Sequence, residues 1–316
     1  MLDLSIIIVN WNVAALLAAC LDSILHSDIA VNTADDARLS VEIIVVDSAS
    51  SDDSVAMLRQ RYPQVTLIAE SENVGYTRGN NSGLRAARGR HLLLLNPDTE
   101  IIGDALQQMV AYLDAHPDVG IVGPNTRNSD GSYQSTRRRF PTLTTAYFES
   151  TWLQPYAPKH LLDSFYVNDA AEDATLDVDW VQGSALMARR EVYEHIGGLD
   201  ERYIMFCEEL DWCHRAKDNG WRVVYIGDAR IIHHGGKSTE QVAARKHIHF
   251  QQSKLRYVHK HHGAFEAQVL RLFLLTSYTW EIAVEGLKAL LGHKRPLRQA
   301  RIDAYRQVLR SGLKVT

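Results

Sequence analysis

Residues 91–101, HLLLLNPDTEI, join four consecutive leucines to the turn Asn96-Pro97-Asp98. An apolar run without polar alternation is typical of a strand buried on both faces, as in a parallel sheet covered by helices. The turn places a carboxylate, that of Asp98, directly after the strand. Because such sheets bind ligands beyond the carboxyl ends of their strands, Asp98 is a candidate for contact with a ligand or a metal ion.

The segments around this strand repeat one pattern. Apolar, strand-like runs alternate with segments of helical periodicity, and the runs are too continuously apolar to have a solvent-facing side. The expected strands are 5–11, 41–47, 65–69, 91–96 and 119–124, and the expected helices are 13–25, 51–62, 80–89 and 104–116. This alternation predicts an α/β fold whose mostly parallel central sheet has helices on both faces.

Charge is distributed unevenly along the chain. Its 316 residues, 46% hydrophobic and 23% charged, are enough for one large domain, alone or with a small appendage. Residues 1–244 contain 20 Lys and Arg against 34 Asp and Glu, whereas residues 245–316 contain 14 against 4. A basic amphipathic tail on an acidic body predicts contact with anionic lipid or an anionic partner, and a solvated helical face is the alternative. Because no nucleic-acid-reading motif is present, we expect no nucleic-acid partner.

The cysteines and the apolar segments indicate in which cellular compartment the protein is expected. Cys20, Cys207 and Cys213 are too few and too irregularly spaced for a disulfide framework or a four-ligand zinc site, which indicates a reducing compartment. The first residues lack the basic region of a signal peptide, and the apolar run after Asp3 is better explained as a strand. No segment has the roughly 18 uninterrupted apolar residues needed to span a bilayer. We therefore expect a cytoplasmic protein.

Polar residues follow three strands of the predicted sheet. Asn10 and Asn12 follow the first strand, Asp47 follows the second, and Asn96 and Asp98 follow the fourth. These side chains are expected on one rim, because the carboxyl ends of parallel strands meet at the same edge of a sheet. The sequences G-x-x-x-x-G-K-[ST] and G-x-G-x-x-G are absent where they would be needed, which argues against the common phosphate-loop and dinucleotide-binding sites.

A second polar cluster lies later in the chain. Glu208, Glu209 and Asp211 fall within four residues at the start of a helical segment. Carboxylates this close repel one another unless a cation or a proton-accepting role keeps them together, although a helix N-terminus also favours acidic residues. Ahead of them, the predicted strand 181–189 contains Gly183, where another group can approach the backbone closely.

The segments on either side of this cluster have weaker patterns. Residues 125–178 predict loops and short elements, and the arginine triplet at 137–139 either clamps phosphates or forms an exposed structural group. Residues 221–234 predict two further strands that end at the histidine pair 233–234.

Taken together in chain order, the sequence segments around these strands and clusters resemble the family 2 inverting glycosyltransferases with the GT-A fold, and among them the bacterial rhamnosyltransferase-type branch. The resemblance covers about residues 3–240. It rests on seven segments in the family's order: SIIIVNWN (5–12), VVDSASSDDS (45–54), ENVGYTRGNNSGL (72–84), LLLLNPDTEI (92–101), QGSALMARR (182–190), GGLDERYIMFCEELDWCHRAKDNGW (197–221) and IIHHGGKST (231–239).

The resemblance implies the ligands of the first rim. Enzymes of this family bind a nucleoside diphosphate sugar whose phosphates are bridged by a divalent cation, Mg²⁺ or Mn²⁺. Their D-x-D-like metal-binding turn matches Asn96-Pro97-Asp98, in which Asn96 supplies no charge and Asp98 is the sole carboxylate. A late metal-contacting histidine maps to His233, with His234 beside it. The implied nucleotide-sugar contacts are Asn10, Asn12, Asp47, Arg78, Asn81, Asn96 and Asp98.

The resemblance also implies the residues of catalysis. Inverting transfer needs a base that removes a proton from the acceptor hydroxyl, and the family's base maps to Glu209, with Glu208 and Asp211 as alternatives. Trp180 and Trp212 are candidate platforms for stacking an acceptor sugar near Gly183, and core packing is the alternative for each tryptophan.

These inferences predict a GT-A domain over residues 1–244, with a nucleotide-sugar-binding half (1–124) and an acceptor and catalytic half (125–244), followed by a basic helical extension (245–316). The expected reaction moves a sugar from a dTDP- or UDP-linked donor, best matched by dTDP-rhamnose, to a glycan or lipid-linked acceptor in cell-surface polysaccharide synthesis. We expect the protein in the cytoplasm, peripheral on the inner face of the membrane, with the extension contacting an anionic membrane surface or forming a homodimer.

Two other classes of protein remain as alternatives. A nucleotidyltransferase should have a glycine-rich, basic phosphate loop after the first strand, and residues 10–20, NWNVAALLAAC, contain none. A non-catalytic nucleotide-sugar-binding module should have lost the acidic residues at the base position, whereas EELD (208–211) retains them.

Overall fold

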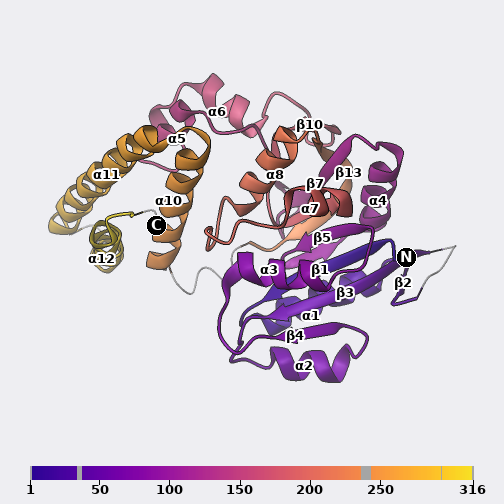
Figure 1. Ribbon diagram of the computed structural model, residues 1–316. Coiled ribbons are helices and arrows are strands. Elements are labelled where there is room, and N and C mark those ends of the chain that lie inside the picture. Colours follow the sequence, from indigo (N-terminus) through magenta and orange to yellow (C-terminus); the bar gives the residue numbers. More distant parts are fainter. Residues whose placement is uncertain (1, 34–37, 236–242, 293, 315–316) are drawn as a thin grey trace. The chain divides into compact units, whose positions relative to one another are not determined.

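A computed structural model describes residues 2–33, 38–235, 243–292 and 294–314 (Figure 1). The chain forms two compact units. The first contains residues 1–140, 166–204 and 208–238, and the second contains residues 141–165, 205–207 and 239–316.

The first unit is built on a mixed sheet with a parallel half. In that half β2 (Ile29–Val31), β3 (Leu39–Asp47), β1 (Leu4–Asn10) and β5 (His91–Leu95) lie next to one another in this order, and β4 (Thr66–Ala69) pairs with β3. All of these pairs are parallel. The leucine-rich segment therefore forms a central strand, as predicted from its continuous apolar run.

The other half of the sheet contains antiparallel pairs. β12 (Ala185–Arg189) runs antiparallel to both β5 and β7 (Val119–Arg127). β13 (Arg222–His233) lies parallel to β7, and its two ends pair antiparallel with β10 (Leu176–Val178) and β6 (Thr99–Ile101). This half of the sheet brings the distant residues 99–101 and 231–233 together.

Two strand predictions need correction. The segment 181–189 is not one strand: β11 (Trp180–Val181) pairs with β9 (Arg137–Arg138) in a separate two-stranded sheet, and the chain enters the main sheet only at β12. Residues 221–234 form one strand and not two, since β13 continues through an irregularity between Ile226 and Arg230.

Helices cover both faces of the parallel half. α1 (Ala14–Leu25) shares a core with Ile6 and Ile8, whereas α3 (Gly75–Ala86) packs on Ile7 and Val9, which point to the opposite face. α3 lies very close to β1: a Cβ atom on Gly79 would be 2.8 Å from Val9, and one on Gly83 would be 2.3 Å from Ile7. Glycine is therefore needed at both positions.

The remaining helices of the first unit are α2 (Ser54–Arg61), α4 (Ala105–Ala115), α7 (Arg190–Ile196) and α8 (Glu208–Asp218). α3 begins five residues before the predicted start at residue 80. The side chain of Asn73 accepts a hydrogen bond from the backbone N–H of Gly75 and so forms an Asx turn directly before the helix.

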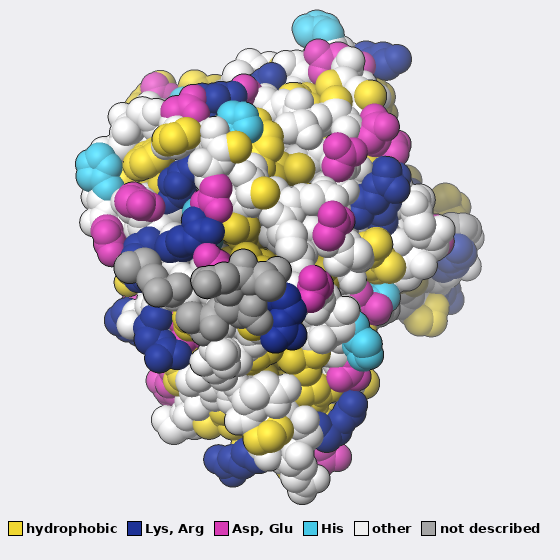
Figure 2. All heavy atoms as spheres, turned by 90° about the vertical axis from the view of Figure 1, so that its right-hand side faces the viewer, with side chains coloured by type: hydrophobic (Ala, Val, Ile, Leu, Met, Phe, Trp, Pro, Cys, Tyr) yellow, Lys and Arg dark blue, Asp and Glu magenta, His cyan; other side chains and the backbone are white. Residues whose placement is uncertain are grey.

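The charges of the molecule are mixed on the face drawn in Figure 2, where Asp and Glu side chains are interspersed with Lys and Arg. Surface ion pairs also join the two signs of charge, such as those of Arg222 with Asp118 and Asp177, each at 2.7 Å. The acidic excess of residues 1–244 therefore does not form one continuous acidic patch on that face.

The second unit is helical. Three long helices, α10 (Ala243–His261), α11 (Ala264–Leu290) and α12 (Arg295–Ser311), enclose an apolar core with α5 (Leu143–Phe148). The predicted C-terminal helical extension is thus present. Among the helices in the described ranges, none is both long enough and apolar enough to cross a membrane. The remaining short elements are η1 (Gln154–Tyr156), α6 (Lys159–Tyr166) and, in the first unit, β8 (Tyr133–Gln134), which pairs with β7.

Candidate active site

Polar groups at the ends of β1 and β3 form one connected cluster. Asn10 and Asp47 are paired in the sheet, and the Asn10 amide nitrogen donates to an Asp47 carboxylate oxygen at 2.8 Å. The other Asp47 oxygen accepts from the backbone N–H of Ser50 at 2.9 Å. Asn12, in the left-handed region at φ +53°, accepts from the N–H of Ser51. The carbonyl oxygen of the buried Asn10 amide has no partner among the described residues and is thus available to a ligand's donor.

The turn after β5 lies beside the end of β13. Antiparallel pairing places His233 opposite Thr99, so that His233 Nε2 is 3.3 Å from a carboxylate oxygen of Asp98. His233 Nδ1 is 2.7 Å from the side-chain oxygen of Gln134. Because that oxygen only accepts, Nδ1 carries the proton in neutral His233, and Nε2 is left as an acceptor beside the Asp98 carboxylate and the Asn96 amide nitrogen.

This arrangement suits a cation. A nitrogen lone pair and a carboxylate oxygen at 3.3 Å repel each other unless a proton or a metal ion lies between them. Asn96, whose amide nitrogen is 3.5 Å from His233 Nε2, adds a neutral group with a carbonyl oxygen that can also ligate. The carboxylate, imidazole and amide together form a donor set that Mn²⁺ or Mg²⁺ accepts.

His234 supports this turn. Its backbone N–H donates to the Asp98 carbonyl oxygen at 2.9 Å. Both of its ring nitrogens are engaged, Nε2 with Glu100 at 2.6 Å and Nδ1 with the hydroxyl of Ser129 at 2.7 Å. His234 is therefore a poor candidate for a metal ligand, and the assignment of that role to His233 is the better one.

Two adjacent carboxylates begin α8. Glu208 is buried, and Glu209 is partly accessible. Burial raises the pKa of both carboxyls, and the neighbouring Glu209 charge raises the pKa of Glu208 further. One carboxylate oxygen of each residue has no hydrogen-bond partner in the part of the chain that is described. The pair therefore favours holding one proton, and the more accessible Glu209 is the better base.

The backbone of Gly183 fixes Glu209. The Gly183 carbonyl oxygen accepts a hydrogen bond from the Tyr76 hydroxyl at 2.8 Å, and its amide donates to the Glu209 carboxylate. A Cβ atom at this glycine would lie 3.1 Å from the Tyr76 oxygen and 3.6 Å from Glu209 Cβ. Burial and the charges of the two glutamates raise the pKa of Tyr76 far above its usual range, so its hydroxyl remains a donor. Tyr76 is not among the residues predicted from the sequence, although it lies within the ENVGYTRGNNSG segment.

Residues 5–195 match the profile of the family described as Glycosyl transferase family 2. The chain belongs to this family. It is a glycosyltransferase, and the nucleotidyltransferase alternative is set aside.

Similar proteins include two rhamnosyltransferases. The chain is 28% identical over 240 residues to the N-acetylglucosaminyl-diphospho-decaprenol L-rhamnosyltransferase of Mycobacterium tuberculosis, covering 72% of this chain and 78% of that protein. It is also 28% identical over 178 residues to the rhamnosyltransferase WbbL of Escherichia coli K12, covering 55% of this chain and 63% of that protein.

The fold of this glycosyltransferase also has a solved counterpart. The mannosyltransferase PcManGT from Pyrobaculum calidifontis, solved with GDP-Man and Mn²⁺, matches with a TM-score of 0.55 at 19% identity. The match covers 98% of this chain and 84% of that protein. The predicted GT-A fold is therefore confirmed.

Three residues predicted for catalysis or the acceptor are part of the glycosyltransferase's core. Asp211 is fully buried and pairs with Arg215 at 2.9 Å, which makes it a structural anion and not an alternative base. Trp180 and Trp212 are 8% and 0% exposed, and their indole N–H groups donate to the carbonyls of Arg139 and Gly197. Neither ring offers a free face for a sugar, so core packing is the correct alternative for both.

Two other predicted ligand contacts also have structural partners. The Asn81 side chain is buried, accepts from the N–H of Leu199 and donates to its carbonyl, and thus fixes the loop around Leu199. Arg137 is buried, and its guanidinium donates to backbone carbonyls in the segment 167–171. Neither is positioned to bind phosphate. The Arg78 side chain is 64% exposed and pairs with the carboxylate of Glu201 at 3.7 Å. Because an exposed pair of this kind is weak, the guanidinium can still reach a nucleotide or sugar.

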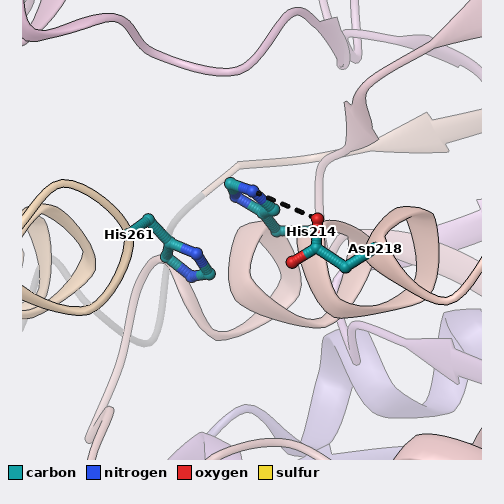
Figure 3. A group of neighbouring side chains, drawn as sticks. All are labelled: His214, Asp218 and His261. Atoms are coloured by element: carbon teal, nitrogen blue, oxygen red, sulfur yellow. Dashed lines mark ion pairs between the residues drawn. The ribbon is translucent and has the colours of Figure 1, made fainter.

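A histidine and an acid on α8 lie apart from these groups. His214 and Asp218, one turn apart, form a 3.8 Å pair (Figure 3). The ring of Phe140 stacks on that of His214. His261, drawn in the same figure, comes from α10 of the second unit. We assign no catalytic role to this pair.

Proposed function

We propose that this glycosyltransferase is a metal-dependent inverting enzyme that transfers rhamnose from dTDP-rhamnose to a glycan or lipid-linked acceptor in cell-surface polysaccharide synthesis. The observation that carries the reaction type is Glu209, a partly accessible residue at the start of α8 whose carboxyl has a raised pKa and accepts from the Gly183 amide.

Glu209 is the proposed base. In the inverting step the acceptor oxygen forms a bond to the anomeric carbon, the bond from that carbon to the diphosphate oxygen breaks on the opposite side, and the acceptor proton passes to Glu209. A raised pKa makes Glu209 a stronger proton acceptor than an ordinary glutamate. Glu208, with its own pKa raised further by its neighbour, keeps the pair's single proton.

The donor is proposed to lie along the rim of the parallel strands. The free Asn10 carbonyl oxygen and the carboxylate of Asp47 are suited to the N–H and hydroxyl donors of a nucleoside, with Asn12 beside them. The exposed guanidinium of Arg78 is suited to a diphosphate or sugar oxygen.

Asp98 and His233, with Asn96 beside them, would hold Mg²⁺ or Mn²⁺. When bound, the cation neutralises the charge that develops on the leaving diphosphate. Because Asn96 replaces a second acid, we expect weak affinity for free metal. The Mn²⁺ in the mannosyltransferase structure supports a divalent ion, and the two rhamnosyltransferase relatives support rhamnose.

A donor panel tests this function. The enzyme is incubated with dTDP-rhamnose, UDP-linked or GDP-linked sugars, with Mg²⁺, Mn²⁺ or a chelator, and with a synthetic N-acetylglucosaminyl diphospholipid acceptor of the kind named for the mycobacterial relative. We expect acceptor-dependent release of dTDP, loss of turnover with chelator, and a product of inverted anomeric configuration by NMR. A retained configuration would contradict the mechanism, and donor binding by calorimetry without turnover would support a non-catalytic module.

A further inference from the structure

An apolar stripe runs along the exposed side of α11. Its members recur every three or four residues, close to the 3.6 residues of one helical turn, and so stay on one face. They are Phe265, Val269, Leu272, Thr276, Trp280, Ala283, Leu287 and Leu290, all exposed. Phe265 and Leu290 are 76% and 77% exposed. The helix has 27 residues, so the stripe is roughly 40 Å long.

Most polar side chains of α11 bond within the helix or to a neighbouring helix, and the exposed ones, Gln268, Thr279 and Lys288, lie at other positions than the stripe. The hydroxyl of Thr276 donates to the carbonyl of Phe273, which leaves its methyl group outward. Glu285 is buried in an ion pair with Arg298 of α12 at 2.8 Å, and Glu281 hydrogen-bonds Tyr305. No acidic residue occupies a stripe position.

Cations surround the C-terminal end of this stripe. Leu290, Leu291 and Leu297 are exposed there, beside the exposed cations Lys294 and Arg295. A cavity of about 520 Å³ opens between α11 and α12, lined by Ala289, Leu290, Arg295, Pro296 and Ile302, among others. The end of the helix pair thus combines apolar side chains with a positive rim.

Aromatic side chains gather near the middle of the stripe. The rings of Trp280 and Trp152 are 6.3 Å apart, and those of Trp152 and Tyr156 are 6.4 Å apart. Trp280 and Tyr156 are 56% and 74% exposed. Tryptophan and tyrosine with one accessible edge are favoured at the boundary between lipid and water.

We propose that this α11 stripe, together with the cationic end at Lys294 and Arg295, docks on an anionic lipid bilayer, with α11 lying in the plane of the interface. The sequence left two partners open, a membrane and a second copy. Charge decides between them: residues 245–316 carry 14 basic against 4 acidic side chains, so two copies would oppose like charges, whereas anionic lipid neutralises them. This proposal is independent of donor and acceptor identity.

Vesicle sedimentation of the full chain tests it. Vesicles of phosphatidylcholine alone are compared with vesicles containing roughly 30% phosphatidylglycerol, a charge density near that of anionic membranes. We expect binding to the anionic vesicles, release in roughly 0.5 M NaCl because salt screens the attraction, and at least about tenfold weaker binding to neutral vesicles.

Paired variants separate the two components of the surface. We expect Lys294→Glu/Arg295→Glu and Leu287→Gln/Leu290→Gln each to weaken anionic-vesicle binding by about tenfold. The matched controls, Arg59→Glu/Arg61→Glu and Ile102→Gln in the first unit, should bind like wild type, and thermal melting verifies that every variant is folded. Equal binding to neutral and anionic vesicles would overturn the proposal. The proposal would also be overturned if the wild-type protein bound no vesicles and formed a dimer in sedimentation velocity that Leu287→Gln/Leu290→Gln dissociates.

Discussion

The Tyr76 hydroxyl donates a hydrogen bond to the Gly183 carbonyl oxygen at 2.8 Å, and the amide of the same glycine donates to Glu209. A helix of the donor half is thereby connected, through one peptide backbone, to the proposed base. Tyr76 thus positions Glu209 from outside the reacting groups. A Cβ atom at this glycine would lie 3.1 Å from the Tyr76 oxygen, a tight contact that would push the hydroxyl away by a few tenths of an ångström.

The Tyr76→Phe variant should lose activity without losing the fold. Removing the hydroxyl frees the Gly183 backbone, weakens the amide's hydrogen bond to Glu209 and lets the Glu209 pKa rise. We expect kcat to fall about tenfold, with the donor KM nearly unchanged and the acidic limb of the pH profile moved to higher pH. Tyr156→Phe, at an exposed tyrosine, is the control. An unshifted pH profile with reduced kcat would indicate a merely structural role.

Glu208→Gln should retain most of the activity. Glutamine resembles the protonated carboxyl that Glu208 is expected to be, so the proton-accepting Glu209 remains. Because burial raises the Glu209 pKa above the ordinary value of 4.5, wild-type kcat should fall on acidification at a pH above that value. Steady-state rates across the acidic and neutral range measure both effects. If Glu208→Gln were as inactive as Glu209→Gln, Glu208 would be the better candidate for the base.

The buried carboxyl of Glu208 should make the free energy of unfolding depend on pH. A carboxyl whose folded-state pKa is raised binds its proton more tightly in the folded state, so its contribution to stability is present at low pH and is lost as pH rises from 4.5 through the folded pKa. Urea unfolding should therefore show Glu208→Gln gaining about 2 kcal/mol over wild type at neutral pH, with little gain in acid. Glu191→Gln, at an exposed glutamate of α7, should show no such difference.

Metal affinity should depend on residue 96, where this chain has Asn in place of the family's usual acid. Asn96→Asp adds a second carboxylate beside Asp98, and we expect it to tighten Mn²⁺ binding without donor about tenfold. Asp98→Ala should abolish that binding and lower turnover by about two orders of magnitude. Calorimetric titration and initial rates measure these effects, with Asp53→Ala as an exposed control. Full activity of Asp98→Ala in chelator would remove the metal from the mechanism.

Asp211 should be important for stability and not for chemistry. Asp211→Ala leaves Arg215, 19% exposed, without its carboxylate partner, and we expect a loss of about 3 kcal/mol in unfolding free energy. The folded fraction should keep near-normal kcat. Asp218→Ala, at an exposed acid of the same helix, should change stability little. A normal stability with abolished turnover would restore Asp211 as a candidate base.

Local patterns were sufficient to predict the parallel half of the fold. The leucines of residues 92–95 and the isoleucines of residues 6–8 are buried on both faces, and a strand of that kind is visible in a short window of sequence. The polar rim at Asn10, Asp47 and Asp98 followed from the same pattern, because the end of each strand is also a local feature.

Long-range contacts could not be predicted in this way. The antiparallel insertion of β12, the pairing that places His233 beside Asp98, and the anchoring of His233 by Gln134 each join segments far apart in the chain. The burial of Trp180 and Trp212 depends on such packing as well, and neither ring has a local signal that separates core from binding site.

Transfer by Glu209→Gln tests the central claim most directly. Sugar transfer from dTDP-rhamnose to a synthetic lipid diphosphate acceptor is measured for wild type and variant under saturating donor and metal, with donor binding checked by calorimetry. Because Glu209 is the proposed base, we predict unchanged donor affinity and a kcat lower by about three orders of magnitude. Wild-type turnover by Glu209→Gln would contradict the account.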